Sequence, residues 1–251
     1  MAHPAAAVLE AALKSRKLDR TLTTALPLIE RSDPSALAPA DLPALDDGLC
    51  GGLPRGALSE LAGPRSSGRT SLLLRLVAAA TRRGELATLV DTSDRLDVAS
   101  AVAAGVDLDR LLWIRGSAGN IEHGRSVERA LKALDLVLQA GGFGVVVLDL
   151  ADVPAVTVKR LPFTIWLRVQ RAIEGSDTAC VLVVPEPLAR SAGGLTLSLA
   201  AGAAWSGATD RGRFLSGTDV RVRIVSPRRR VSGEIIIKSH IPNPKPQVPS
   251  W

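Results

Sequence analysis

The chain has 251 residues, of which 46% are apolar and 22% are charged, so it is long enough for one sizeable core with appendages. Its two cysteines, Cys50 and Cys180, lie far apart without a CxxC motif or a Cys/His cluster, which argues against a disulfide framework and a zinc site. The N-terminus lacks the charge order of a signal peptide and no apolar run is as long as a membrane span, so we expect a cytoplasmic protein. The formal net charge of +6 favours an acidic partner, either nucleic acid or an acidic protein surface.

Both ends of the chain differ from its centre. Residues 4–19 predict a short helix, and residues 21–43 mix Pro, Ser and Asp in the manner of a linker. The last stretch, "IPNPKPQVPSW", has four prolines and is typical of an extended or disordered tail. We therefore divide the chain into a helical arm and linker (1–40), a core (41–240) and a tail (241–251).

The core alternates between apolar runs and amphipathic stretches. Continuous apolar runs predict strands that helices cover on both faces, and hence an α/β fold with a largely parallel central sheet. After Pro187 the helices stop, and three further runs predict antiparallel strands. The expected strands are 57–62, 86–91, 111–115, 143–149, 179–184, 195–205, 218–226 and 231–240, and the expected helices are 68–83, 95–104, 122–140 and 159–174.

The stretch "GPRSSGRTS", residues 63–71, lies between a predicted strand and a predicted helix. A phosphate-binding loop needs glycines at its turns, a helix N-terminus, a cation and a hydroxyl group for Mg²⁺. Gly63 and Gly68 supply the turns and Thr70 the hydroxyl, but Arg69 stands where lysine is expected, and arginine is not a conservative replacement at a cramped phosphate site. A plain Gly/Ser connection between a strand and a helix is the alternative.

A second candidate element is "GVVVLD", an apolar strand that ends in Asp149, where a nucleotide hydrolase would place a carboxylate that organises Mg²⁺. An ordinary strand end, with Asp149 in a turn, is the alternative. Together the two elements suggest weakly bound ATP and Mg²⁺. The candidate nucleotide-binding residues are Gly63, Ser66, Ser67, Gly68, Arg69, Thr70, Ser71 and Asp149.

Three motifs, "GGLPRGALSELAGPRSSGRTS", "VDTSDRLD" and "GVDLDRLL", resemble in order and spacing the nucleotide-binding core of bacterial RecA, over roughly residues 45–240. The resemblance implies a RecA-like phosphate-loop core. It also places Ser93 where RecA has the glutamate that polarises the attacking water, and Glu186 where RecA has a glutamine that senses the γ-phosphate. Serine cannot act as that base, and a carboxylate repels a phosphate. The two segments that carry the DNA-binding loops in RecA, after Asp149 and after Glu186, are short here.

These departures are similar to those of ImuA, a RecA-like accessory protein of mutagenic translesion synthesis, and more distantly to those of SulA, an inhibitor of cell division. The resemblance implies a non-catalytic, SOS-associated protein whose partners are an inactive Y-family polymerase homologue, a replicative-type polymerase subunit and RecA itself. It implies weak or no direct DNA binding and no membrane partner. Two alternatives stay open, an active DNA-dependent ATPase of RecA type and a SulA-like inhibitor.

A basic segment lies near the C-terminus. In "VRVRIVS", Arg221 and Arg223 alternate with apolar residues, so one strand face is expected to be charged and the other to enter the core. The run Arg228, Arg229 and Arg230 follows directly. These arginines either protect an edge strand from pairing with other chains or form a patch for an acidic protein or DNA.

Overall fold

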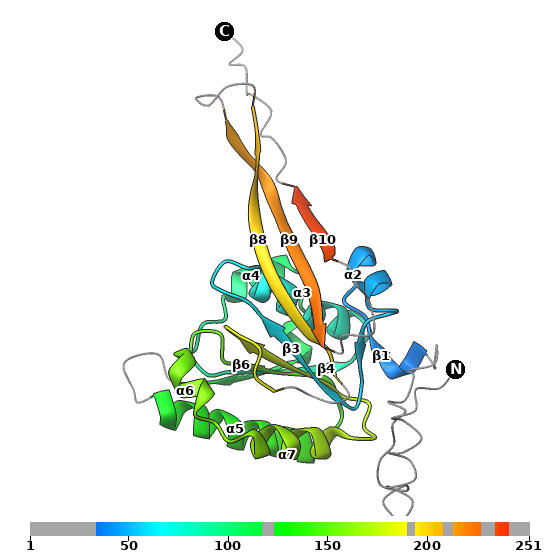
Figure 1. Cartoon of the computed structure of the whole chain (residues 1–251). Coiled ribbons are helices and arrows are strands. Elements are labelled where there is room, and N and C mark those ends of the chain that lie inside the picture. Colours follow the sequence, from blue (N-terminus) through cyan, green and yellow to red (C-terminus); the bar gives the residue numbers. More distant parts are fainter. Residues whose placement is uncertain (1–33, 117–122, 190–193, 208–212, 227–233, 241–251) are drawn as a thin grey trace, which may run out of the picture. The chain divides into compact units, whose positions relative to one another are not determined.

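The computed structural model describes residues 34–116, 123–189, 194–207, 213–226 and 234–240 (Figure 1). The chain divides into two compact units, Met1–Asp33 and Pro34–Trp251, and the described residues all belong to the second. The predicted arm helix and the proline-rich tail lie outside the described residues. The elements are η1 (Pro34–Ala36), β1 (Leu37–Ala38), α2 (Pro43–Gly48), β2 (Leu53–Pro54), β3 (Ala57–Ala62), α3 (Arg69–Arg82), β4 (Leu86–Asp91), α4 (Val98–Ala103), η2 (Leu108–Arg110), β5 (Leu111–Arg115), α5 (His123–Ala140), β6 (Phe143–Asp149), α6 (Ala155–Lys159), α7 (Phe163–Ile173), β7 (Ala179–Val184), β8 (Thr196–Ser206), β9 (Phe214–Ser226) and β10 (Glu234–His240).

An eight-stranded sheet of order β10-β9-β8-β3-β7-β6-β4-β5 forms the centre of the second unit. The strands from β8 to β5 in this order run parallel, whereas β9 and β10 are antiparallel to their neighbours. Every residue of β3 and of β7 is buried, as expected of central strands that are covered on both faces. The predicted α/β fold, with a largely parallel sheet and antiparallel C-terminal strands, is confirmed.

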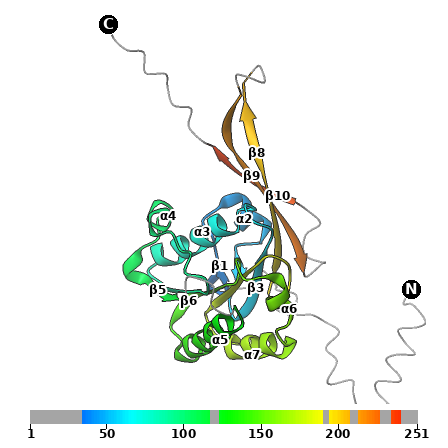
Figure 2. The same ribbon diagram turned by 90° about the vertical axis from the view of Figure 1, so that its left-hand side faces the viewer.

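Two hydrophobic clusters lie on opposite faces of the sheet. Figures 1 and 2 show α3 and α4 on one face and α5 and α7 on the other. The apolar stripe predicted for α5 packs against the sheet, with Val127 and Leu134 nearly inaccessible to solvent. α7 packs beside it through Trp166 and Ile173. Among the described residues, no helix is long and apolar enough to cross a bilayer.

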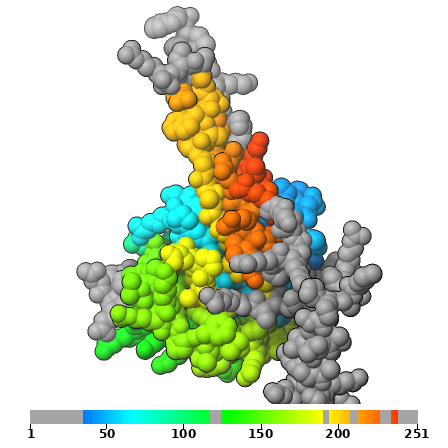
Figure 3. Space-filling model, in the orientation of Figure 1, coloured from blue at the N-terminus to red at the C-terminus, as the bar shows by residue number. Residues whose placement is uncertain are grey.

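The strands β8 and β9 are longer than their neighbours and form a ribbon that projects beyond the helical layers (Figures 1 and 3). We call residues 199–206 of β8 and 214–222 of β9 the ribbon. Large apolar side chains stay exposed on it, with Trp205 exposed over 59% of its surface and Phe214 over 41%.

Three local predictions differ from the structure. The helix predicted over 159–174 is two helices, α6 and α7, because Pro162 cannot donate the hydrogen bond that would continue the first one. β9 begins at Phe214, earlier than the predicted residue 218. Residues 34–40, which we assigned to the arm and linker, belong to the core unit, since Leu37 and Ala38 pair with β2 and Ala40 is buried.

Candidate nucleotide-binding site

The loop of residues 63–68 joins the buried strand β3 to the helix α3. Gly68 caps α3 with a φ of 90°, a conformation that favours glycine, and its carbonyl accepts the amide of Leu72 at 2.9 Å. Ser66 also has a positive φ, 61°. The first amides of α3 therefore point toward the space in front of the loop, where the positive end of the helix dipole favours an anion.

Two glycines also let the loop pack beneath the ribbon. A Cβ atom at Gly63 would lie 2.5 Å from the carbonyl oxygen of Leu199 in β8. A Cβ atom at Gly68 would lie 2.7 Å from Cγ2 of Val220 in β9. Both distances are too short for real Cβ contacts, so packing requires glycine at both positions, and at Gly68 the backbone conformation requires it as well.

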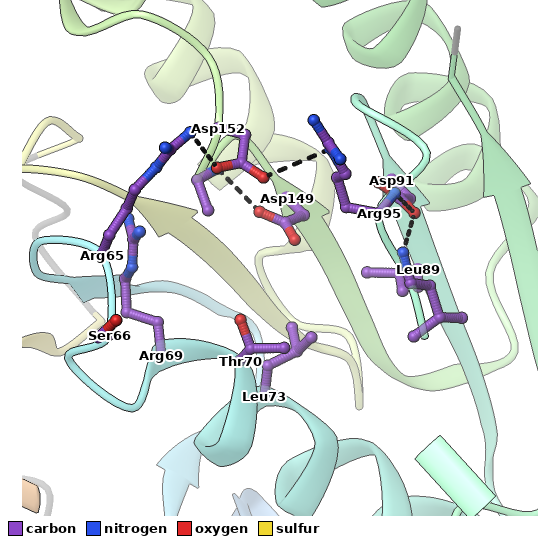
Figure 4. Close-up of a pocket in the computed structure, with 12 residues that line it drawn as sticks. Arg65, Ser66, Arg69, Thr70, Leu73, Leu89, Asp91, Arg95, Asp149 and Asp152 are labelled. Atoms are coloured by element: carbon purple, nitrogen blue, oxygen red, sulfur yellow. Dashed lines mark hydrogen bonds and ion pairs between the residues drawn. The ribbon is translucent and has the colours of Figure 1, made fainter. Parts of the chain in front are cut away.

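A cavity of about 200 Å³ lies in front of the loop (Figure 4). It brings together four of the predicted residues, Ser66, Arg69, Thr70 and Asp149, from the loop, α3 and β6. The predicted residues Gly63, Ser67, Gly68 and Ser71 belong to the same loop and helix but do not line the cavity. The lining residues are Arg65, Ser66, Arg69, Thr70, Leu73, Leu89, Asp91, Arg95, Leu96, Asp149, Ala151 and Asp152.

Arg69 is the main cation of this cavity, and only 6% of its surface is exposed. Its Nη1 has no hydrogen-bond partner among the described residues, and neither has Oγ of the buried Ser67. Burial lowers the pKa of Arg69, and the nearby Asp149 and Asp152 partly oppose this effect. A buried guanidinium group with an unpaired nitrogen is costly unless an anion binds to it, so the site fits a phosphate group.

Asp149 ends β6 and accepts the amide of Ala151 at 2.8 Å. Burial raises the pKa of Asp149 to about 6, and the carboxylates of Asp91 and Asp152 act in the same direction. Figure 4 shows the Thr70 hydroxyl on the side of the cavity that faces Asp149. A hydroxyl and a carboxylate are oxygen ligands of the kind that Mg²⁺ prefers, so this pair fits a Mg²⁺ ion bound with a phosphate.

The pKa of Asp149 predicts a dependence of stability on pH. Because the pKa in the folded state is about 6 and the ordinary value is lower, the folded chain keeps this proton through a pH range in which the unfolded chain has lost it. Asp149 should therefore cost stability as pH rises from about 4 to 6, by up to about 3 kcal/mol. Denaturation of the wild type and of Asp149→Asn across this range should give curves that diverge in favour of the variant. Parallel curves would show that Asp149 titrates normally.

Three charged residues at the cavity rim were not predicted as site residues. Arg65 contacts Asp152 at 3.2 Å, and Arg95 lies 4.0 Å from the other oxygen of Asp152 (Figure 4). Asp152 therefore bridges two arginines that come from different loops. Its position three residues after Asp149 was the sequence signal that could have indicated it.

Asp91, at the end of β4, is a further residue that the sequence analysis missed. One of its oxygens, Oδ2, accepts the amides of Arg95 and Leu96 at 2.7 and 2.8 Å and Nε1 of Trp113 at 3.2 Å. These bonds fix the loop between β4 and α4, which forms one wall of the cavity. Asp91 is thus already supplied with donors and acts as a positioning residue.

Ser93, which stands at the position of the water-polarising glutamate of RecA, lies in this loop. Neither Ser93 nor Asp94 lines the cavity. Asp94 has a φ of 54° and forms a two-pronged ion pair with Arg115 at 2.8 and 2.9 Å. Arg115 in turn stacks on Trp113, with its guanidinium carbon 4.5 Å from the ring centre. Asp94 is therefore held away from the cavity by Arg115.

Glu186 follows β7 and does not line the cavity. Its carboxylate pairs with Nζ of Lys159, the last residue of α6, at 2.6 Å, and both side chains are exposed. The ion pair joins the segment after β6 to the segment after β7. These are the two segments that the resemblance to RecA associates with DNA-binding loops.

The basic segment lies partly within the described residues. Arg221 and Arg223 are exposed on β9, and their neighbours Val222 and Ile224 are buried, as predicted. The edge-protection interpretation is wrong for Arg221 and Arg223, because β9 lies between β8 and β10 and is not an edge strand there. Residues of opposite charge lie across from each other on β9 and β10. Arg223 is in register with Glu234, and Asp219 is in register with Lys238. Arg228, Arg229 and Arg230 lie outside the described residues.

Comparison with known proteins agrees with this geometry. The RecA N-terminal domain family matches residues 35–160. Protein RecA of Methylococcus capsulatus is 43% identical over 117 residues, which are 46% of this chain and 31% of that protein. Protein RecA of Clavibacter michiganensis is 37% identical over 146 residues, 52% of this chain and 38% of that protein. The aligned part thus spans roughly a third of these relatives. From the phosphate loop, the sheet order and these matches together, the chain belongs to the RecA N-terminal domain family.

Proposed function

We propose that this protein binds a nucleotide without rapid hydrolysis and serves as an accessory factor in DNA damage tolerance, in the manner of ImuA in SOS-associated translesion synthesis. The observation that carries the proposal is a well-formed phosphate loop beside a cavity that lacks a free carboxylate at the water-polarising position. Such a site can hold phosphates but is poorly equipped to activate water.

The nucleotide part of the proposal rests on the buried cation and on the helix N-terminus. The loop amides and Arg69 would hold the phosphates of ATP, and Thr70 and Asp149 would hold Mg²⁺. The unpaired Nη1 of Arg69 favours a bound anion over an empty structural loop. The raised pKa of Asp149 means that burial disfavours its negatively charged form. A bound Mg²⁺ ion would supply the positive charge that stabilises this carboxylate.

The proposed accessory role rests on two chain connections, one between β6 and α6 and the other between β7 and β8. Residues 150–154 lead from β6 directly into α6, and residues 185–195 lead from β7 into β8. The Lys159–Glu186 ion pair links these two regions. We infer that these two connections are too short for DNA-binding loops of the RecA kind and that the chain works through protein contacts, with an inactive Y-family polymerase homologue, a replicative-type polymerase subunit and RecA as the partners. Co-purification with each of them tests this assignment.

A DNA-dependent ATPase is the second candidate, since Thr70 and Asp149 are both in place at the cavity. It differs from the first candidate in turnover and in DNA affinity.

DNA titration at two salt concentrations separates an accessory protein from a recombinase-like one. We expect weak binding to single-stranded and duplex DNA, because Glu234 lies opposite Arg223 and breaks up the positive patch. Each duplex phosphate that a basic residue neutralises adds about 0.9 to the logarithmic salt slope. The double variant Arg221→Ser/Arg223→Ser should therefore change the slope little.

Arg129→Ser/Arg171→Ser is the matched control, because it removes two exposed positive charges, on α5 and α7, far along the chain from β9. Tight binding whose slope falls by about 2 in the Arg221/Arg223 variant but not in the control would contradict the accessory role. That result would favour direct DNA contact by β9.

A further inference from the structure

The outer edge of β8 is only partly covered. β3 pairs with β8 at Thr196, Leu197 and Ser198, and β9 pairs with the other edge of β8 along its whole length. The loop of residues 63–68 packs against the carbonyl oxygen of Leu199 through Gly63, and from Ala200 to Ser206 no strand among the described residues pairs with the outer edge. Figure 3 shows this part of β8, in yellow, standing clear of the helical layers.

This free edge lacks the charges and prolines that usually keep strand edges apart, and one register irregularity of the β8–β9 pair lies beside it, between Ala204 and Trp205. Its sequence over residues 200–206, "AAGAAWS", has no charged residue and no proline. Exposed edges in natural proteins are normally protected by charges, prolines, bulges or covering elements. An uncovered, uncharged edge offers its amides and carbonyls to another strand.

The other edges of the same sheet are protected. β5 ends in the exposed Arg115, and Arg110 precedes it. β10 carries Glu234 and Lys238, and the helix α2 packs against it, with Gly48 close to Ile235. Compared with the charged edges of β5 and β10, the uncharged edge of β8 is better suited to pairing with another strand.

We propose that two copies of this chain pair through the free edges of β8, antiparallel and centred on Ala203. In this pairing each Trp205 lies opposite Ala201 of the other copy, and Ala203 lies opposite its own counterpart. Directly opposite residues share a face of the sheet, so the small alanine leaves room for the indole ring. The edge is thus complementary to itself, as a two-fold interface requires.

A second copy fits this edge better than other occupants. The net charge of +6 would oppose self-association through a charged surface, but the β8 edge contributes no charge. The proline-rich tail of the same chain is a poor strand partner, because proline has no amide to donate. A strand from a different protein would form the same backbone hydrogen bonds. The β8 edge, however, carries no charge or other feature that would select such a strand.

Pairing would also stabilise the ribbon itself. β10 pairs with β9 only from Gly217 to Arg223, so the tip of the ribbon is two-stranded among the described residues. Two-stranded segments are marginally stable in water, and additional strands stabilise them. Trp205, now 59% exposed, would lose much of that exposure. Because only a short strand segment is shared, the interface is small and the association should be reversible and dependent on concentration.

Sedimentation equilibrium over a dilution series tests the proposal with a matched pair of variants. Ala203→Lys puts a charge on the free edge, where it meets its own counterpart, and should shift the protein to monomer at every concentration. Thr218→Lys is the control, since Thr218 lies directly opposite Ala203 on β9 and is equally exposed but does not lie at the edge. It should leave the monomer–dimer equilibrium of the wild type unchanged.

A disulfide trap tests the register. In a background with Cys50→Ser, which removes the exposed native cysteine, Ala203→Cys should form a covalent dimer under mild oxidation. Opposed residues in antiparallel strands have Cα atoms about 4.5–5.5 Å apart, a distance that a disulfide spans. Thr218→Cys should not form one. A wild type that is monomeric throughout, or equal effects of the two lysine variants, would overturn the proposal, and a strand from another protein would then be the better occupant.

Discussion

ATP hydrolysis by the wild-type chain should be about 10²- to 10⁴-fold slower than hydrolysis by an intact RecA assayed beside it, with Mg²⁺ and single-stranded DNA present, because the general base is missing. Ser93 stands at the position of that base, and Arg115 holds the neighbouring Asp94 away from the cavity. Asp149 and Asp91 line the cavity, but Oδ2 of Asp91 fixes its loop and Asp149 is the residue that would hold Mg²⁺. Neither carboxylate therefore replaces the missing base at the position of Ser93.

Two substitutions separate binding from turnover. Arg69→Lys should tighten nucleotide binding, since lysine places a compact charge in the loop, but should leave hydrolysis slow. The double variant Arg69→Lys/Ser93→Glu should hydrolyse ATP faster than either single variant. Asp94→Ser serves as a control that changes the same loop without adding a base. Rapid turnover by the wild type, or its full recovery in Arg69→Lys alone, would contradict this account and favour the ATPase candidate.

The strands could be predicted well because their signal is local. β3, β4, β5, β6 and β7 occupy the predicted residues, since each is a short apolar run bounded by turn residues. The order of these strands in the sheet carries no such local signal. The ribbon also exceeds the prediction, because Phe214 and Leu215 extend β9 over residues that no core buries.

The candidate site was predictable only in part. The phosphate loop and Asp149 lie in short motifs, so sequence alone could indicate them. The rim contact between Arg65 and Asp152 joins residues 87 positions apart, and it exists only because β3 and β6 end at the same side of the sheet. Asp91 was missed for a related reason, since its role depends on amides of the following loop and on Trp113 from the next strand.

The structural role of Glu60 could not be predicted from the sequence pattern. It lies within the apolar run of β3, is only 1% exposed, and accepts three hydrogen bonds. Its Oε1 accepts the amides of Leu188 and Ala189 at 2.8 and 2.6 Å, and its Oε2 accepts the hydroxyl of Thr196 at 2.9 Å. These partners lie 128 to 136 residues away along the chain. Glu60 therefore ties the strand that leads into the phosphate loop to the connection between β7 and β8.

Glu60→Ala should lower the free energy of unfolding by roughly 3–5 kcal/mol, because it leaves buried donors without an acceptor. Glu60→Gln should cost only about 1 kcal/mol, since the amide oxygen can accept both backbone amides and the amide nitrogen can donate to the Thr196 hydroxyl. Glu174→Ala, at an exposed position after α7, is the control and should change stability by less than about 0.5 kcal/mol. Urea denaturation of the three variants measures these differences. If Glu60→Ala and Glu60→Gln were equally mild, water would have to replace the carboxyl group, and the connection between β7 and β8 would not depend on Glu60.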